Sequence, residues 1–211
     1  GLAHVFPAVG KLLATFHQAP TRVRRRVSVA SELAMVNGAL RIVTRTFPQM
    51  RQHARACVAA LKALQWNDDV PAVLLHGAYR LSHILHADGE LALVDLDSLR
   101  VGHPGYDLGK FLAYLYYLEA LGEISASGRR DAAHTFLQAY TAAAPWRISP
   151  AAVLWFLASE LLIKQTKKDI MQPGDNRREN VERVLKLAEA ALLAARESQA
   201  GCSLPEVCTA I

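Results

Sequence analysis

The stretch that decides the fold runs from residue 74 to residue 115 and reads LLHGAYRLSHILHADGELALVDLDSLRVGHPGYDLGKFLAYL. An apolar run leads into His76 and Gly77, a polar loop follows, and apolar residues resume at Ile84. This order is typical of a catalytic loop between two short strands. The residue directly after the glycine is Ala78.

Short strands surround this loop, and helices account for most of the rest of the chain. Apolar runs predict strands at 72–76, 83–86 and 91–95. Asp88-Gly89 between the last two predicts a tight hairpin, because glycine supplies the positive φ that the turn needs. The sequence therefore predicts a mostly α fold with one small β-hairpin island.

The helices are predicted from apolar residues at helical spacing and from the prolines and polar residues that interrupt it. The predicted ranges are 2–18, 29–46, 48–65, 106–121, 128–143, 150–170 and 176–199. Ser149 followed by Pro150 is typical of an N-cap with proline in the first turn. No period is visible after Gly201, so residues 201–211 are expected to form a loose tail.

Composition and charge place the chain among globular proteins. Its 211 residues are enough for one large domain or two small ones, and 52% apolar content excludes a disordered chain. The net charge of +5 favours anionic ligands in general. The positive charges are scattered apart from RVRRR at 22–26, so nucleic acid is not an expected partner. That run is either a solvated loop or helix entrance, or an anion-binding patch.

Cysteine usage and hydropathy narrow the expected location. Cys57, Cys202 and Cys208 are odd in number and lack metal-ligand spacing, which argues against a disulfide framework and favours a reducing cytoplasm. No apolar run reaches the roughly 18–20 residues that cross a bilayer, so no membrane association is predicted. The most apolar stretch, at 153–163, is interrupted by Glu160.

Two carboxylates follow the hairpin. Asp95 and Asp97 lie two residues apart at the predicted strand end, and the pleat would point both to the same side. Two close acids suit a hard cation such as Mg²⁺, which takes one or two carboxylates together with substrate phosphates. The alternative from this segment alone is that one aspartate caps a turn while the other faces solvent.

The ordered motifs of the 74–115 stretch resemble the catalytic core of the aminoglycoside phosphotransferase and choline kinase-like family, which has the protein-kinase-like fold. The matching positions are His76, Gly77, the Asp88-Gly89 turn, Asp95, Asp97, Gly102, Pro104, Tyr106, Asp107 and Leu108. VGKLLATFHQAP at 9–20 is similar to the helix that follows the hinge in that family. The resemblance implies that residues 1–200 form the C-terminal lobe, with a catalytic loop at 76–83 and a metal-binding strand end at 95–97.

The resemblance also implies roles for single residues. Asp95 takes the place of the family's main Mg²⁺ ligand, with Asp97 as a further metal ligand. His83 stands where the loop asparagine helps to hold metal and nucleotide, and Ala78 where the aspartate accepts the proton of the acceptor hydroxyl. Asp107 matches the aspartate that opens the next helix, and we expect it to be a buried N-cap and loop brace.

Two more positions complete this comparison. His76 is expected to organise the loop and not to act as a base. His103 replaces a family aspartate. The implied cofactors are ATP and Mg²⁺.

Three functions are compatible with the departures from the family pattern at Ala78, His83 and His103. The first is an ATP-dependent small-molecule kinase that is weak or inactive because Ala78 replaces the base. The second is a pseudokinase-like module that binds a ligand or partner without transfer. The third, an engineered aspartate-to-alanine knockout, would explain Ala78 but neither His83 nor His103.

The partners are expected to be a small-molecule acceptor and a nucleotide-binding lobe. The chain starts at the post-hinge helix of the family, and no glycine-rich loop or strand lysine precedes it, so that lobe either was removed or is naturally lacking. The charge of residues 110–199 is close to balanced. This balance favours a sugar, an amino alcohol or an anionic metabolite over a polycation.

Overall fold

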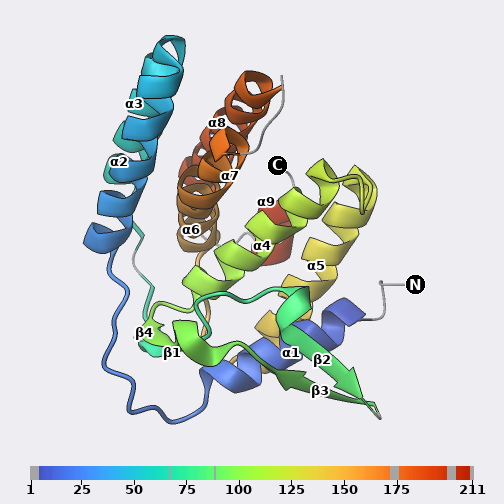
Figure 1. Cartoon of the computed structure of the whole chain (residues 1–211). Coiled ribbons are helices and arrows are strands. Elements are labelled where there is room, and N and C mark those ends of the chain that lie inside the picture. The colour runs from blue at the N-terminus through green and yellow to red at the C-terminus, as the bar shows by residue number, and fades with distance from the viewer. Residues whose placement is uncertain (1–4, 67, 88, 172–175, 199–202, 210–211) are drawn as a thin grey trace.

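The computed structural model describes residues 5–66, 68–87, 89–171, 176–198 and 203–209, and most of them are helical (Figure 1). The helices are α1 (Val5–His17), α2 (Val29–Thr46), α3 (Arg51–Ala63), α4 (Gly105–Ala120), α5 (Ala126–Ala143), α6 (Pro150–Glu160), α7 (Thr166–Met171), α8 (Arg177–Glu197) and α9 (Leu204–Thr209). The strands are β1 (Val73–Leu75), β2 (Ile84–Ala87), β3 (Glu90–Leu93) and β4 (Arg100–Gly102). The mostly α fold with a small β island is thus confirmed.

Serine side chains start three of the helices. Ser28, Ser125 and Ser149 each accept a hydrogen bond from a backbone N–H in the first turn of α2, α5 and α6. Pro150 occupies the first turn of α6 after Ser149, as the sequence predicts. The predicted helix over 150–170 is interrupted at Leu161–Gln165, where one π-helical turn separates α6 from α7.

The strands form two antiparallel pairs. β2 and β3 make the predicted hairpin, with Ile84 opposite Leu93. Gly89 has φ of 81°, as the turn requires, whereas Asp88 lies outside the described residues. β1 pairs with β4, and the sequence analysis predicted no strand at the residues of β4. Three residues between a turn and a proline are too few to show a strand period.

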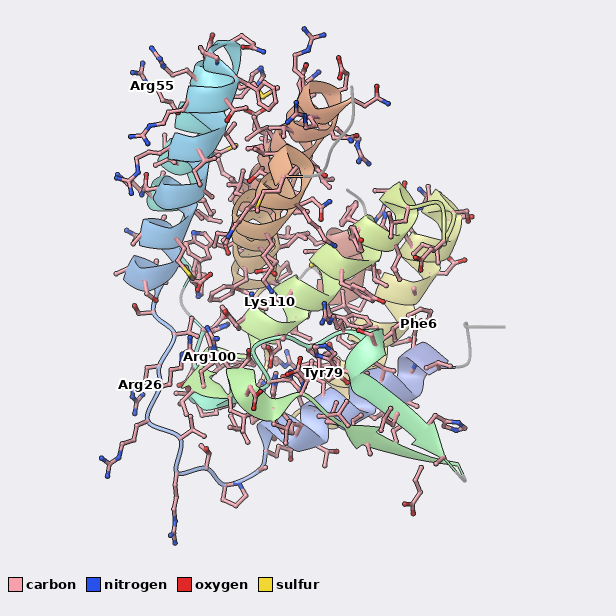
Figure 2. All side chains as sticks on the ribbon, in the orientation of Figure 1. Phe6, Arg26, Arg55, Tyr79, Arg100 and Lys110 are labelled. Carbon is pink, nitrogen blue, oxygen red and sulfur yellow. The ribbon has the colours of Figure 1, made fainter. Side chains whose placement is uncertain are left out.

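The arginine run at 22–26 is an extended segment beside β4. Val101 donates its N–H to Arg25 O at 2.7 Å and accepts one from Val27 at 2.9 Å. The arginine side chains of the run are exposed. Figure 2 shows Arg26 pointing away from the body of the protein.

Helices from the N-terminal, middle and C-terminal parts of the chain build the core. α6 packs against α4 and α8, and α1 crosses α5. The α2–α3 pair stands along α6–α8 on the other side from α4 and α5 (Figure 1). The fully buried Trp155 of α6 donates its indole N–H to Leu61 O of α3 at 2.9 Å, which ties the two parts together. Among the described residues, no helix combines the length and the apolar content needed to cross a bilayer.

The end of the chain corrects one prediction. Residues 201–211 were expected to be loose, but Leu204–Thr209 forms α9, which packs on α5 and α6 and buries Leu204 and Cys208. A helix of six residues is too short for its period to be visible in the sequence. Cys57 and Cys208 are free and buried, while Cys202 lies outside the described residues.

The crossing of α1 and α5 predicts a sharp difference between two glycines. A Cβ at Gly10 would lie 2.3 Å from Phe136 O, whereas a Cβ at Gly38 of α2 would meet nothing within 4 Å. We expect Gly10→Ala to lower the free energy of unfolding by about 1–3 kcal/mol through overpacking. Gly38→Ala should raise it by about 0.5–1 kcal/mol, because alanine loses less entropy in a helix. Urea unfolding of both variants measures this, and equal effects would contradict the close crossing.

Candidate functional site

The predicted catalytic loop is held at its start by a buried carboxylate. Asp107, on the first turn of α4, accepts the backbone N–H of His76 at 2.7 Å and that of Gly77 at 2.9 Å. Gly77 has φ of 81°, and a Cβ there would lie 2.3 Å from Ser98 O. Glycine is therefore the residue that fits this bend.

A chain of buried side chains supports Asp107 from the other side. His17, the last residue of α1, places Nε2 3.2 Å from Asp107 Oδ2 and Nδ1 2.9 Å from the Tyr140 hydroxyl. The Trp146 indole N–H donates to the same hydroxyl at 3.2 Å. Because the Tyr140 hydroxyl accepts from Trp146, we assign its own hydrogen to the bond with His17 Nδ1. His17 Nε2 then carries the ring hydrogen and donates a hydrogen bond to the Asp107 carboxylate.

The pKa of Asp107 results from two opposing effects. Complete burial alone would raise it, because a charge is poorly solvated there. The hydrogen bonds from His17 and from the two loop amides outweigh burial and hold the pKa below its ordinary value. The carboxylate is therefore ionised, and it braces the loop.

The N-cap part of the Asp107 prediction is wrong. α4 starts at Gly105, so Asp107 is its third residue, and its two oxygens bind the loop amides and His17. His17 is a residue that the sequence analysis missed. The available signal was its spacing of four and eight residues from Leu13 and Val9, which places it on the buried face of α1.

His76 and Tyr79 anchor the loop at two further points. His76 donates its Nε2–H to Val94 O at 3.0 Å and accepts the Ala78 N–H at Nδ1, 3.3 Å away. Both ring nitrogens are thus occupied by backbone groups. The buried Tyr79 donates its hydroxyl to Val9 O of α1 at 2.7 Å.

His83 stands between a cation and a carboxylate. Arg80 Nε lies 2.7 Å from His83 Nε2 and donates to it, and Asp95 Oδ2 lies 3.1 Å from the same nitrogen. One ring nitrogen cannot accept from Arg80 and donate to Asp95 at once, and the shorter contact decides for Arg80. His83 Nδ1 is buried without a hydrogen-bond partner among the described residues. Burial and the Arg80 charge both lower the pKa of His83.

Asp95 and Asp97 are arranged differently from the prediction. β3 ends at Leu93, so strand alternation does not apply to either aspartate. Asp95 adopts the left-handed conformation, with φ of 60° and ψ of 56°, and its side chain is 47% exposed. Asp97 follows in a 3-10 turn and is exposed, but only Asp95 borders the pocket beside the loop.

His103 has a structural partner. Its Nε2 lies 3.2 Å from Asp68 Oδ2, which also accepts the Ser149 N–H at 3.0 Å. Burial alone would raise the pKa of Asp68, but these hydrogen bonds outweigh burial and lower it. His103 thereby connects the start of α4 to the start of α6.

A pocket of about 230 Å³ opens beside the predicted catalytic loop. Its lining residues are Ala78, Tyr79, Arg80, His83, Asp95, Lys110, Ala113, Tyr114, Tyr117, Glu160, Lys164, Gln165 and Lys168. Figure 2 shows Lys110 and Tyr79 on the inner side of the fold, whereas Arg55 points into solvent. The pocket unites the loop position of the expected base with Asp95.

A buried ion pair on the pocket wall was also missed by the sequence analysis. Lys110 of α4 contacts Glu160 of α6, and Lys164 Nζ lies 3.1 Å from the other Glu160 oxygen. The available signal was the lone acid within the apolar stretch 153–163, because a buried carboxylate requires a cationic partner. The partner itself, 50 residues away, gave no local signal.

The sequence profile of the phosphotransferase enzyme family, APH, matches residues 2–146, more than half of the chain. The chain belongs to this family. The match confirms the resemblance that the 74–115 stretch carries. A search of curated proteins found no match.

Solved kinase structures share the fold at low sequence identity. The choline kinase LicA from Streptococcus pneumoniae superposes with a TM-score of 0.61 at 15% identity, covering 89% of this chain and 64% of that one. A choline/ethanolamine kinase family protein from Mesorhizobium loti has a TM-score of 0.55 at 15% identity, covering 98% of this chain and 67% of that one. The amicoumacin kinase solved with AMP-PNP, Ca²⁺ and Ami has a TM-score of 0.58 at 17% identity, covering 89% and 59%. The chain thus spans about two thirds or less of these structures.

Membership of the phosphotransferase family implies a divalent metal. The residues beside the pocket that could bind such a metal are only partly suited to it. Asp95 offers a half-exposed carboxylate at the pocket edge. His83 offers no oxygen, and its Nε2 is taken by Arg80. No group of three or more His, Cys, Asp or Glu side chains suited to a metal occurs among the described residues. The arrangement fits Mg²⁺ held by one carboxylate and by nucleotide phosphates.

Replacing the buried brace predicts a loss of stability that depends on pH. Asp107→Asn puts an NH₂ group against an N–H donor, and we expect the free energy of unfolding to fall by about 1–3 kcal/mol at neutral pH. The folded pKa of Asp107 is depressed, so its contribution is present above the unfolded value of about 4 and is lost as pH falls through the folded pKa.

Urea unfolding between neutral and acidic pH measures this effect. Wild type should lose stability more steeply than Asp107→Asn at the acidic end. The exposed Asp131→Asn on α5 is the matched control. Equal stability losses in the two variants would remove the proposed bracing role.

Proposed function

We propose that the chain is the acceptor-binding part of an ATP- and Mg²⁺-dependent phosphotransferase that acts on a hydroxyl of a small molecule and turns over slowly. The observation that carries this proposal is the pocket in which loop position 78 and Asp95 meet. The family match supports the reaction class. The low proposed rate follows from Ala78, because an alanine side chain cannot act as a base in the loop.

The residues of the loop act mainly through position. Asp107 fixes the loop backbone at His76 and Gly77, and His76 fixes the segment that leads to Asp95 through Val94. Phosphoryl transfer passes through a loose transition state, so positioning and charge neutralisation supply most of the catalysis. The absence of a base at position 78 lowers the rate of transfer by about 10²- to 10⁴-fold, which leaves measurable turnover.

Asp95 would hold the metal, which when bound neutralises phosphate charge. Asp97 would act only as a secondary ligand, because it does not border the pocket. The glycine-rich loop and lysine that grip nucleotide phosphates in kinase-like enzymes would come from a lobe outside these 211 residues. Residues 1–200 would then form the C-terminal lobe, and the free buried Cys57 and Cys208 suit a reducing cytoplasm.

A second candidate is a binding module without transfer activity. Its support is the pairing of His83 with Arg80, which occupies the position expected to help hold the metal. A chain of this kind would bind its ligand in the same pocket and leave ATP unconsumed. The two candidates differ in their response to the restored base.

Metal binding tests the role of Asp95. We expect Asp95→Asn to weaken Mn²⁺ binding in the presence of ADP by about tenfold or more. Replacing a residue that only supports a metal ligand lowers metal affinity by about 10- to 100-fold, so replacing a ligand itself should lower it at least as much. Electron paramagnetic resonance of free Mn²⁺ measures the affinity. Asp97→Asn, on the adjacent exposed turn, is the control and should have a smaller effect. A larger effect of Asp97→Asn would reverse the assignment.

Restoring the acid tests the function itself. Ala78→Asp should raise ATP-dependent transfer by about 10²- to 10⁴-fold if the loop otherwise has an active geometry. Transfer is measured by ATP consumption and product mass over sugars, amino alcohols and hydroxy acids, in the 211-residue chain and in the full natural protein. Ala78→Asn matches the shape without a base and should stay slow. Nucleotide binding without transfer in every form would favour the binding module.

A further inference from the structure

The pocket beside the catalytic loop has an excess of positive charge. Of the residues that the structure describes, four with cationic side chains and two with carboxylates, Asp95 and Glu160, border it. The cationic residues are Arg80, Lys110, Lys164 and Lys168. Such a pocket attracts an anion and repels a cation.

The Glu160 carboxylate does not cancel this excess. It is nearly buried and is shared between Lys110 and Lys164. Burial alone would raise its pKa, but the two lysines outweigh burial and hold the pKa below its ordinary value. Glu160 is therefore ionised, yet one negative charge faces two positive ones.

Two other cations of the pocket have no carboxylate within ion-pair distance among the described residues. Lys168 Nζ lies over the Tyr117 ring, 3.3 Å from its centroid. Arg80 donates its Nε–H to the ring of His83, which leaves the rest of its guanidinium without a charged partner. Both groups are exposed enough to bind a ligand from solution.

The segment that contains the π-helical turn Leu161–Gln165 and the start of α7 supplies several of these groups. Lys164 and Lys168 lie four residues apart, a spacing that places both on one helix face. They border the pocket together with Gln165, whereas the exposed Lys167 does not. Two cations and an amide thus face the same space.

The size of the pocket limits the ligand. Its volume of about 230 Å³ lies below the roughly 300–1,000 Å³ of sites for drug-sized ligands. A compact metabolite fits within this space, whereas a molecule of several sugar rings would extend beyond it.

We infer that the acceptor is a small hydroxylated anion, with a carboxylate or phosphate bound by Lys164, Lys168 and Arg80 and its hydroxyl at loop position 78. This inference rests on the proposed phosphotransferase function. It narrows the acceptor classes that the sequence left open, because a cationic amino alcohol would meet the excess positive charge.

A comparison of small hydroxylated probes that differ in charge tests the charge preference. Glycerate and glycerol 3-phosphate carry the two anionic groups, and glycerol is their neutral counterpart. Choline is the cationic probe. Amide chemical shifts of the 211-residue chain in ¹H–¹⁵N spectra report binding without requiring transfer. Binding of either anion with shifts at Ala78 and Gln165, and weaker binding of glycerol and choline, is expected.

Charge-removing variants test the assigned residues. Lys168→Gln and Lys164→Gln should each weaken binding of the preferred anion about fivefold, the effect of one unit charge at about 4 Å in water. Lys167→Gln removes the same charge from the neighbouring exposed position and should leave binding unchanged. A loss with Lys167→Gln as large as with Lys168→Gln would show only a general charge effect and overturn the inference.

The remaining outcomes separate this inference from the proposed function. Glycerol or choline binding as tightly as the anions would overturn the anionic acceptor, even if transfer to a neutral acceptor were observed. Displacement of glycerate by ADP would assign the cations to the nucleotide and also overturn it. Anion binding that Lys168→Gln weakens, without transfer in any form, would support the anionic site while removing the phosphotransferase function.

Discussion

The carboxylate of Asp107 is the group on which the rest of the site depends. It lies fully buried and holds three hydrogen bonds, from His17 and from the amides of His76 and Gly77. A buried charge is tolerated only when such partners replace water. Because the partners come from α1 and from the catalytic loop, while Asp107 belongs to α4, this one requirement fixes three parts of the chain relative to each other.

This scaffold is separate from the residues that border the pocket. Asp107 does not line the pocket, whereas Ala78, His83 and Asp95 do. The identity of the residue at position 78 can therefore change without disturbing the hydrogen bonds that shape the loop, since the Ala78 contact with His76 uses a backbone N–H. The hydrogen bonds that shape the loop are therefore independent of the side chain at position 78, which is an alanine in this chain.

Sequence patterns predicted the features that depend on local order. The cap at Ser149 and the β2–β3 hairpin follow from neighbouring residues, and the structure has them. The missed features depend on short elements or distant partners. β4 and α9 are too short to show a period. The pairing of Lys110 with Glu160 arises only once α4 and α6 are packed.

The left-handed backbone of Asp95 has a consequence for stability. A residue with a Cβ pays about 1–2 kcal/mol in this conformation, aspartate somewhat less than most, and glycine pays almost nothing. Folding alone would thus favour glycine at position 95. A redesign of this chain guided only by thermostability would select that glycine and remove the carboxylate from the pocket edge, so position 95 has to be held fixed in any such redesign.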